Sequence, residues 1–260
     1  MAGLTGDQRE GGMTEAEWLE CTDWASGRNV TEQEWLECKD PLKMLVFLRV
    51  KMLGLLREAV SEKVSDRKPR LLGCACCHRL WHLLSDERSR KALSIAERYA
   101  DGEVSAEKLG YAWGDARRAA QVAHRQERQT AEGAAMYAVA MLCQADIGRA
   151  LEAVHLAAGC EAYSLGHARL ADIHNEQIPL LRDLFGNPFQ PVALDSALRT
   201  PAVVQLARSL YEEKRFEDLP VLADALEEAG CQDATVLEHC RGPGPHVKGC
   251  WVLDLLLGKE

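Results

Sequence analysis

The amino-acid sequence predicts an all-α protein, a compact multi-helix bundle of short and medium helices. Apolar residues recur at three-and-four spacing along most of the chain, as they do on the buried face of a helix. Capping residues and Pro or Gly breaks divide this pattern into segments. No stretch shows the sustained alternation and β-branched enrichment of a strand, so we expect no strand.

The N-terminal forty residues differ in character from the rest. Residues 1–12 are Gly-rich and polar, which is typical of disorder. Residues 13–40 hold a duplication, because Thr14–Cys21 recurs as Thr31–Cys38. Each copy predicts a short helix with a Thr cap and a Glu three positions later, the two halves of a capping box. Ten acidic and three basic residues give residues 1–40 a formal charge of −7, so we expect an acidic arm.

Residues 41–260 are predicted to form a helical domain. Asp40 and Pro41 suit the N-cap and first position of its first helix. The Pro-containing loop at 186–200 is a candidate sub-boundary. The helices that we expect cover residues 41–48, 69–84, 86–101, 105–158 (as two or more helices), 167–185, 201–213, 216–229, 233–240 and 250–257.

Composition and charge limit the classes of function. With 260 residues, 47% hydrophobic and 27% charged, the chain can build a sizeable core. The net charge of −9 argues against nucleic-acid binding through phosphate neutralisation. Residues 66–98 carry eight basic and four acidic residues, so the acidic arm could lie on a basic body, or the charges could be surface scatter. With neither a secretory leader nor a membrane-spanning apolar run, we expect a cytoplasmic protein with mostly reduced cysteines.

Two segments carry candidate metal ligands. Cys74 and Cys77 would share one face of a helix, which supplies half of the four ligands that a structural zinc site needs. The C-terminal segment places two His and two Cys within twelve positions around a Gly-Pro-Gly-Pro turn. If the two segments meet, the candidate zinc ligands are Cys74, Cys77, His239, Cys240, His246 and Cys250. In the alternative interpretation the cysteines pack in the core and the histidines form hydrogen bonds.

Other patterns give weaker indications. Cys74-x-x-Cys77-His78 matches the haem c attachment motif, which goes with export, and a redox Cys-x-x-Cys needs a βαβ setting. Glu152 and His155 form one carboxylate–imidazole pair where di-iron bundles use two. Residues 117–128 are basic without interleaved aromatic residues, which favours a solvent-facing helix.

The chain end predicts a docked helix rather than a frayed tail. Trp251 and three successive leucines at 255–257 are too apolar to remain in water. The Gly-Pro-Gly-Pro turn before them restricts the backbone and reverses the chain. We therefore expect the last residues to seal the helical core.

Eight segments form a further pattern: Trp35–Pro41, Ser65–Leu71, Cys74–Cys77, Asp86–Arg90, Ala96–Gly102, Leu181–Phe189, Leu222–Gly230 and the tail from His239 to Lys259. Together these motifs resemble a family of uncharacterised planctomycete (Gemmata-type) helical proteins. The resemblance covers roughly residues 30–260 and implies a helical module present in many copies per genome. It implies no known activity and therefore no catalytic residue. The position of His78 is usually Arg in that family, which weakens a ligand role for His78.

These observations favour a non-catalytic cytoplasmic interaction or regulatory module with a protein partner and, if the ligands converge, a structural zinc ion. The alternative is a metal- or thiol-dependent enzyme that uses Cys74, Cys77 and the C-terminal cluster. A second alternative is a nucleic-acid-binding module that uses the bases of residues 66–98 and 117–128. No P-loop, dinucleotide-binding, nucleophile-elbow or zincin motif is present in the sequence, so no catalytic residue is proposed.

Overall fold

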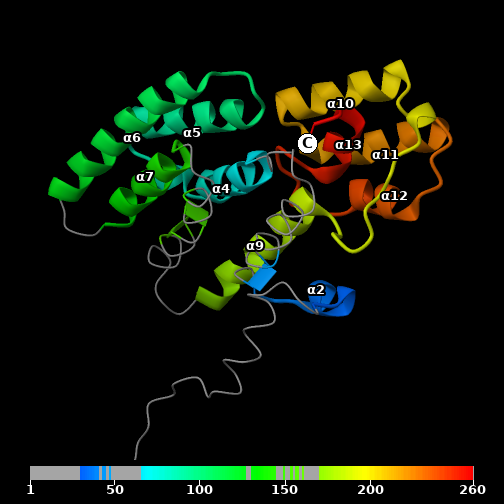
Figure 1. Ribbon diagram of the computed structural model, residues 1–260, viewed down its shortest axis with the longest axis horizontal. Helices are drawn as coiled ribbons and strands as arrows, with labels where there is room; N and C mark the ends of the chain where they lie inside the picture. The colour runs from blue at the N-terminus through cyan, green and yellow to red at the C-terminus, as the bar shows by residue number, and fades with distance from the viewer. Residues whose placement is uncertain are drawn as a thin grey trace, which may run out of the picture. The chain divides into compact units, whose positions relative to one another are not determined.

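The structure is a computed structural model of the 260-residue chain (Figure 1). It describes residues 30–40, 43–44, 47, 66–126, 130–144, 149, 153–154, 156–157, 160 and 170–259. Contacts divide the chain into two compact units, residues 1–38 with 42–64 and residues 39–41 with 65–260. Every regular element in the described part is helical, which confirms the all-α prediction. None of the described helices combines the length and apolarity needed to cross a membrane.

The described part of the first unit contains the second copy of the duplication as α2 (Glu32–Glu37). Its capping box forms as predicted: Thr31 Oγ1 accepts the Glu34 N–H at 3.2 Å, and Glu34 Oε2 accepts the Thr31 N–H at 2.8 Å. Trp35 is fully buried, with its ring 5.5 Å from that of Phe47. The predictions for residues 1–12 and for the first copy lie outside the described residues.

The second unit begins with four helices that pack successively against one another (Figure 1). Local caps begin two of them: Asp86 accepts the Arg88 N–H at 2.9 Å, and Thr130 accepts the Gly133 N–H at 3.1 Å. The 105–158 stretch is therefore divided into separate helices, as the sequence predicts. The four helices are α4 (Arg67–Arg79), α5 (Glu87–Ala100), α6 (Ala106–Gln126) and α7 (Ala131–Leu142).

The helix predicted over residues 69–84 differs from the structure at both ends. It begins at Arg67, which places Pro69 at the third position, where the backbone N–H of any residue lacks an intrahelical partner and proline costs no bond. It ends at Arg79 and is followed by a 3₁₀ turn at Trp81–Leu83. Leu80 and Leu84 on either side of this turn are fully buried, so tertiary packing sets this end of the helix.

After α7, the fully described helices of the second unit are α9 to α13. The expected 216–229 helix begins as a 3₁₀ turn, Phe216–Asp218, before α11. The 186–200 loop, which includes the 3₁₀ turn Ser196–Leu198, lies within this unit. The helices are α9 (Leu170–Phe185), α10 (Pro201–Glu213), α11 (Leu219–Glu228), α12 (Ala234–Arg241) and α13 (Trp251–Leu257).

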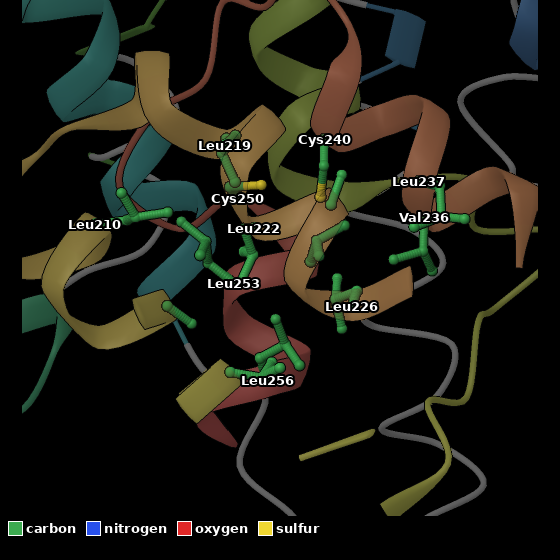
Figure 2. Packing of buried hydrophobic residues seen from close by; sticks show 14 of the residues in the cluster. Leu210, Leu219, Leu222, Leu226, Val236, Leu237, Cys240, Cys250, Leu253 and Leu256 are labelled. Atoms are coloured by element: carbon green, nitrogen blue, oxygen red, sulfur yellow. The ribbon is translucent and has the colours of Figure 1, made fainter. Parts of the chain in front are cut away.

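A buried apolar cluster unites α10–α13 (Figure 2). Leu253 and Leu256 of α13 are fully buried among the leucines of α10 and α11. Trp251 is 9% exposed and belongs to the same cluster. The tail is thus part of the core, as its sequence predicts.

A buried ionic network connects α13 to the first helices of the unit. The Arg67 guanidinium donates to both carboxylate oxygens of Asp254, at 2.7 and 2.8 Å, and to the Tyr211 hydroxyl at 2.7 Å. Asp101 accepts from Arg67 Nε at 3.1 Å and from Lys248 Nζ at 2.7 Å. The bidentate geometry and the additional partners stabilise charges that would otherwise be costly to bury.

Candidate metal centre

Four potential metal ligands from separate segments converge beside the apolar cluster. Asp183 lies in the last turn of α9, His239 lies on α12, and His246 lies in the turn that follows α12. Cys250 is the residue directly before α13. One ligand atom from each residue lies within 4.8 Å of those of all the others. Asp183 and Cys250 are buried, and the histidine side chains are 18% and 9% exposed.

Backbone features of the tail set this convergence. Asp233 caps α12 by accepting the N–H groups of Thr235 and Val236. After α12 the chain turns through Gly244 and Gly249, which have φ values of +76° and +95°. A Cβ at Gly249 would lie 2.6 Å from Leu184 Cδ2, so only glycine allows the turn to approach α9 this closely. This approach brings the turn beside Asp183.

Asp183 is the centre of the contacts within the group. Its Oδ1 lies 2.7 Å from His246 Nδ1 and 3.2 Å from His239 Nε2. His239 Nε2 in turn lies 3.2 Å from Cys250 Sγ. One imidazole nitrogen therefore faces both a carboxylate oxygen and a sulfur. If this nitrogen carries a proton, it can donate to the Asp183 carboxylate. If it carries a lone pair, it can accept from the Cys250 thiol. No single tautomer therefore gives both contacts their best hydrogen bond.

Outer contacts orient two of the four ligands. His246 Nε2 lies 3.4 Å from the Gly242 carbonyl oxygen, to which an Nε2–H would donate, leaving the Nδ1 lone pair facing the centre. The Val247 N–H donates to Asp183 Oδ2 at 2.9 Å, which leaves Oδ1 for a ligand. Hydrogen bonds of this kind commonly hold metal-binding side chains in position.

The electrostatics of the group favour a positive charge at its centre. Burial alone would raise the pKa of Asp183, but the hydrogen bonds from His239 and His246 outweigh it and hold the pKa below its usual value. Burial lowers the pKa of His246, but the Asp183 carboxylate outweighs this and raises it. Burial raises the pKa of Cys250 well above its usual value, so its thiolate requires a nearby cation.

The geometry differs from that of a Cys–His–Asp catalytic triad. In a triad the imidazole uses one nitrogen for the nucleophile and the other for the carboxylate. Here Cys250 and Asp183 both face Nε2 of His239. The thiol is also fully buried, which hinders its contact with a substrate. The arrangement suits a shared ion better than proton transfer to and from a nucleophile.

The structure brings together three of the six residues that the sequence singles out. His239, His246 and Cys250 join the group, whereas Cys240 is buried nearby but contributes no atom to it. Cys74 and Cys77 lie on α4, and within the described residues they belong to no group of three or more potential ligands. The predicted joint site between α4 and the tail therefore does not form in the described part.

Cys74 and Cys77 instead pack in the core. Both side chains are buried, and burial raises the pKa of each thiol well above its usual value. The neighbouring His78 places Nε2 2.7 Å from Glu97 Oε1, so this imidazole has a structural partner. The pair Glu152 and His155 lies outside the described residues.

Asp183 is the potential ligand that sequence reasoning missed. It lies 56 positions before His239, so no local spacing connects it with the tail. A weaker signal exists, because Asp183 falls among the apolar residues Leu180, Leu181 and Leu184, which are all buried. A carboxylate on the apolar face of a helix needs a buried partner.

Comparison with known proteins adds no assignment. No protein-family model matches the chain, and no curated protein or solved structure matches it either. The resemblance to the planctomycete family therefore stays a prediction.

Proposed function

We propose that this protein is a non-catalytic helical interaction module whose C-terminal part is fastened by a structural zinc ion. The observation that carries the proposal is the convergence of Asp183, His239, His246 and Cys250 within 4.8 Å. These residues come from α9, α12, the following turn and the start of α13. An ion held by all four would connect segments that are distant in the sequence.

The donor types and the charges support zinc. Carboxylate oxygen, imidazole nitrogen and thiolate sulfur are all zinc ligands, whereas Mg²⁺ and Ca²⁺ prefer oxygen alone. One carboxylate and one thiolate neutralise a divalent ion, which suits a buried position. Bonds of about 2.0–2.3 Å in a tetrahedron place the ligands roughly 3.3–3.8 Å apart. The observed separations of 2.7 to 4.8 Å bracket that range, so small shifts would complete the site.

A structural role fits better than a catalytic one. A catalytic zinc keeps one coordination position open for water or substrate, whereas four protein ligands fill a tetrahedron. The ligands also lie within or beside the buried cluster of α10–α13. These features weigh against the alternative of a thiol- or metal-dependent enzyme at this site.

The binding role is the second part of the proposal. A cytoplasmic location, where thiols remain reduced, suits the thiolate ligand and the buried cysteines. Nucleic acid is a poor partner, because Arg67 and Arg70 of the basic 66–98 stretch are buried in contacts with Asp254 and Asp66. We therefore propose a protein partner.

Metal analysis of the purified full-length protein tests the zinc site. We expect about one zinc per chain, and loss of that zinc in Cys250→Ala and His246→Ala. Cys240→Ala is the matched control, because it removes a buried thiol of the same cluster that lies outside the group. Cys74→Ala should also retain zinc. Wild-type protein without zinc after reconstitution, or equal loss in Cys240→Ala, would overturn the proposal.

Cobalt substitution keeps the test decisive if a variant folds poorly. Co²⁺ bound to wild-type protein should give a thiolate-to-metal charge-transfer band and tetrahedral d–d bands. The chelated wild-type protein should remain helical with a lower melting temperature, because the apolar cluster persists without the ion. Spectra with no thiolate band would show that Cys250 is not a ligand and would contradict the assigned site.

A further inference from the structure

A cavity lies between α6 and α7, away from the metal-ligand group. Its volume is about 820 Å³, which falls within the range of small-molecule sites. Ala120 of α6 and Gly133 and Ala134 of α7 line it with small residues. Leu156 and Cys160 add apolar surface.

Aromatic side chains border this cavity. Trp113 of α6 and Tyr137 of α7 both line it, and Tyr137 is 49% exposed. Contact between an aromatic ring and water is unfavourable, so an apolar ligand that covers these rings would gain free energy. The cavity thus offers apolar surface that includes the flat faces of two aromatic rings.

The ionisable side chains among the described lining residues are basic. Arg117 and His124 line the cavity from α6, seven positions apart and so on one helix face, and no Asp or Glu stands among the described residues that line it. The whole chain carries a net charge of −9, so this described lining differs from the protein as a whole. In the described part of the chain, Arg117 has no carboxylate partner, and its guanidinium stacks 5.2 Å from the Trp113 ring centre. Gln121 and Gln144 add amide groups.

We propose that this cavity binds a small organic anion with an apolar body. Arg117 pairs with the carboxylate or equivalent anionic group, and His124 and the two glutamines contribute hydrogen-bond donors. Trp113 and Tyr137 cover the apolar body above the alanine- and glycine-lined floor. This gives a role to Arg117 and His124 of the basic run at 117–128, which the metal-centre proposal does not use.

Binding of matched ligands to the full-length protein tests this site. The probes are 2-naphthoate, its neutral analogue 2-naphthamide, and decanoate, with tryptophan fluorescence and calorimetry as the readouts. We expect a carboxylate to bind about tenfold more tightly than the amide, which corresponds to about 1.4 kcal/mol. The naphthoate and decanoate arms decide whether the apolar body is aromatic or aliphatic. Carboxylates that fail to bind at millimolar concentration, or that bind no better than the amide, would refute the proposal.

Variants place the binding at the cavity. Arg117→Gln should weaken carboxylate binding about tenfold and leave amide binding unchanged. Arg118→Gln is the matched control, because Arg118 is the next residue, pairs with Asp115 at 2.5 Å and does not line the cavity. Ala134→Leu should abolish binding of every probe by filling the space. Equal effects of the two arginine substitutions, with unchanged melting temperatures, would mean that the anion binds elsewhere.

Discussion

Removing the Trp251 side chain tests whether the C-terminal tail stabilises the core. Trp251 begins α13 and belongs to the apolar cluster of α10–α13. Its ring lies against Gly186, where a Cβ would come within 3.3 Å of the indole, and 5.0 Å from the His239 ring. Trp251→Ala therefore opens a cavity between the tail and the end of α9.

The burial of the Trp251 ring determines how much stability the substitution should remove. An aromatic side chain buries about 150–250 Å², and Trp251 is only 9% exposed. At about 25 cal/mol per Å², that area corresponds to roughly 4–6 kcal/mol, an upper bound because denatured chains already bury part of their apolar surface. Large-to-small substitutions of buried aromatic residues cost about 3–5 kcal/mol. We expect Trp251→Ala to lower the free energy of unfolding by this amount.

Urea denaturation, followed by far-ultraviolet circular dichroism, measures the change. Trp81→Ala is the matched control, since Trp81 is 43% exposed and its removal should cost about 1 kcal/mol or less. An unchanged dependence on urea concentration would show that the two variants unfold over the same transition. A loss below about 0.5 kcal/mol for Trp251→Ala, or a loss equal to that of Trp81→Ala, would refute the assignment of the tail to the core.

Two further predictions address backbone fit and pH. Gly249→Ala and Gly230→Ala share positive φ values of +95° and +97°, but only Gly249 has leucine atoms of α4 and α9 within 2.8 Å of the added Cβ. In thermal unfolding, Gly249→Ala should lower the free energy of unfolding by about 1–3 kcal/mol more than Gly230→Ala does. Equal losses would show that the turn can move away from the two leucines. Burial raises the pKa of Glu97, but its hydrogen bonds with His78 and Lys214 outweigh this and lower it. The stabilisation that ionised Glu97 provides is complete above the pKa of about 4.3 that a glutamate has in the unfolded chain. It is lost as the pH falls through the lower pKa of Glu97 in the folded protein. Glu97→Gln should therefore have a lower free energy of unfolding than wild type at pH 7, and the difference should shrink below pH 4. An equal difference at both pH values would contradict this role of Glu97.

The fold could be predicted because its helix signals are local. Asp86 and Asp233 are the first residues of two helices that the sequence predicts, and each caps its helix in the structure. Pro201 begins α10 as expected, since its fixed φ suits the first helical turn. The prediction failed after Arg79, where the burial of Leu80 and Leu84 interrupts the α-helix. Such burial depends on partners far along the chain, so local propensity does not reveal it.

The candidate site could be predicted only in part, for the same reason. His239, His246 and Cys250 lie on one short segment, so their spacing is visible in the sequence. The fourth residue follows from how the tail docks on α9, which brings Asp183 into contact with both histidines. The motif at Cys74 and Cys77 attracts attention because of its spacing, yet the packing of α4 turns those thiols into the core.

At the tail, the residues that pack in the core and the potential metal ligands belong to one arrangement. Cys250 belongs both to the buried cluster and to the group of four. Trp251 follows it directly and contacts the ring of His239, so the residue that docks α13 also restrains a ligand. The turn that carries His246 is held against α9 by the close approach of Gly249 to Leu184. In the proposed zinc site, core packing would position the donors before an ion binds, so that binding would order little additional chain. This would distinguish the site from a zinc finger that folds only with its metal.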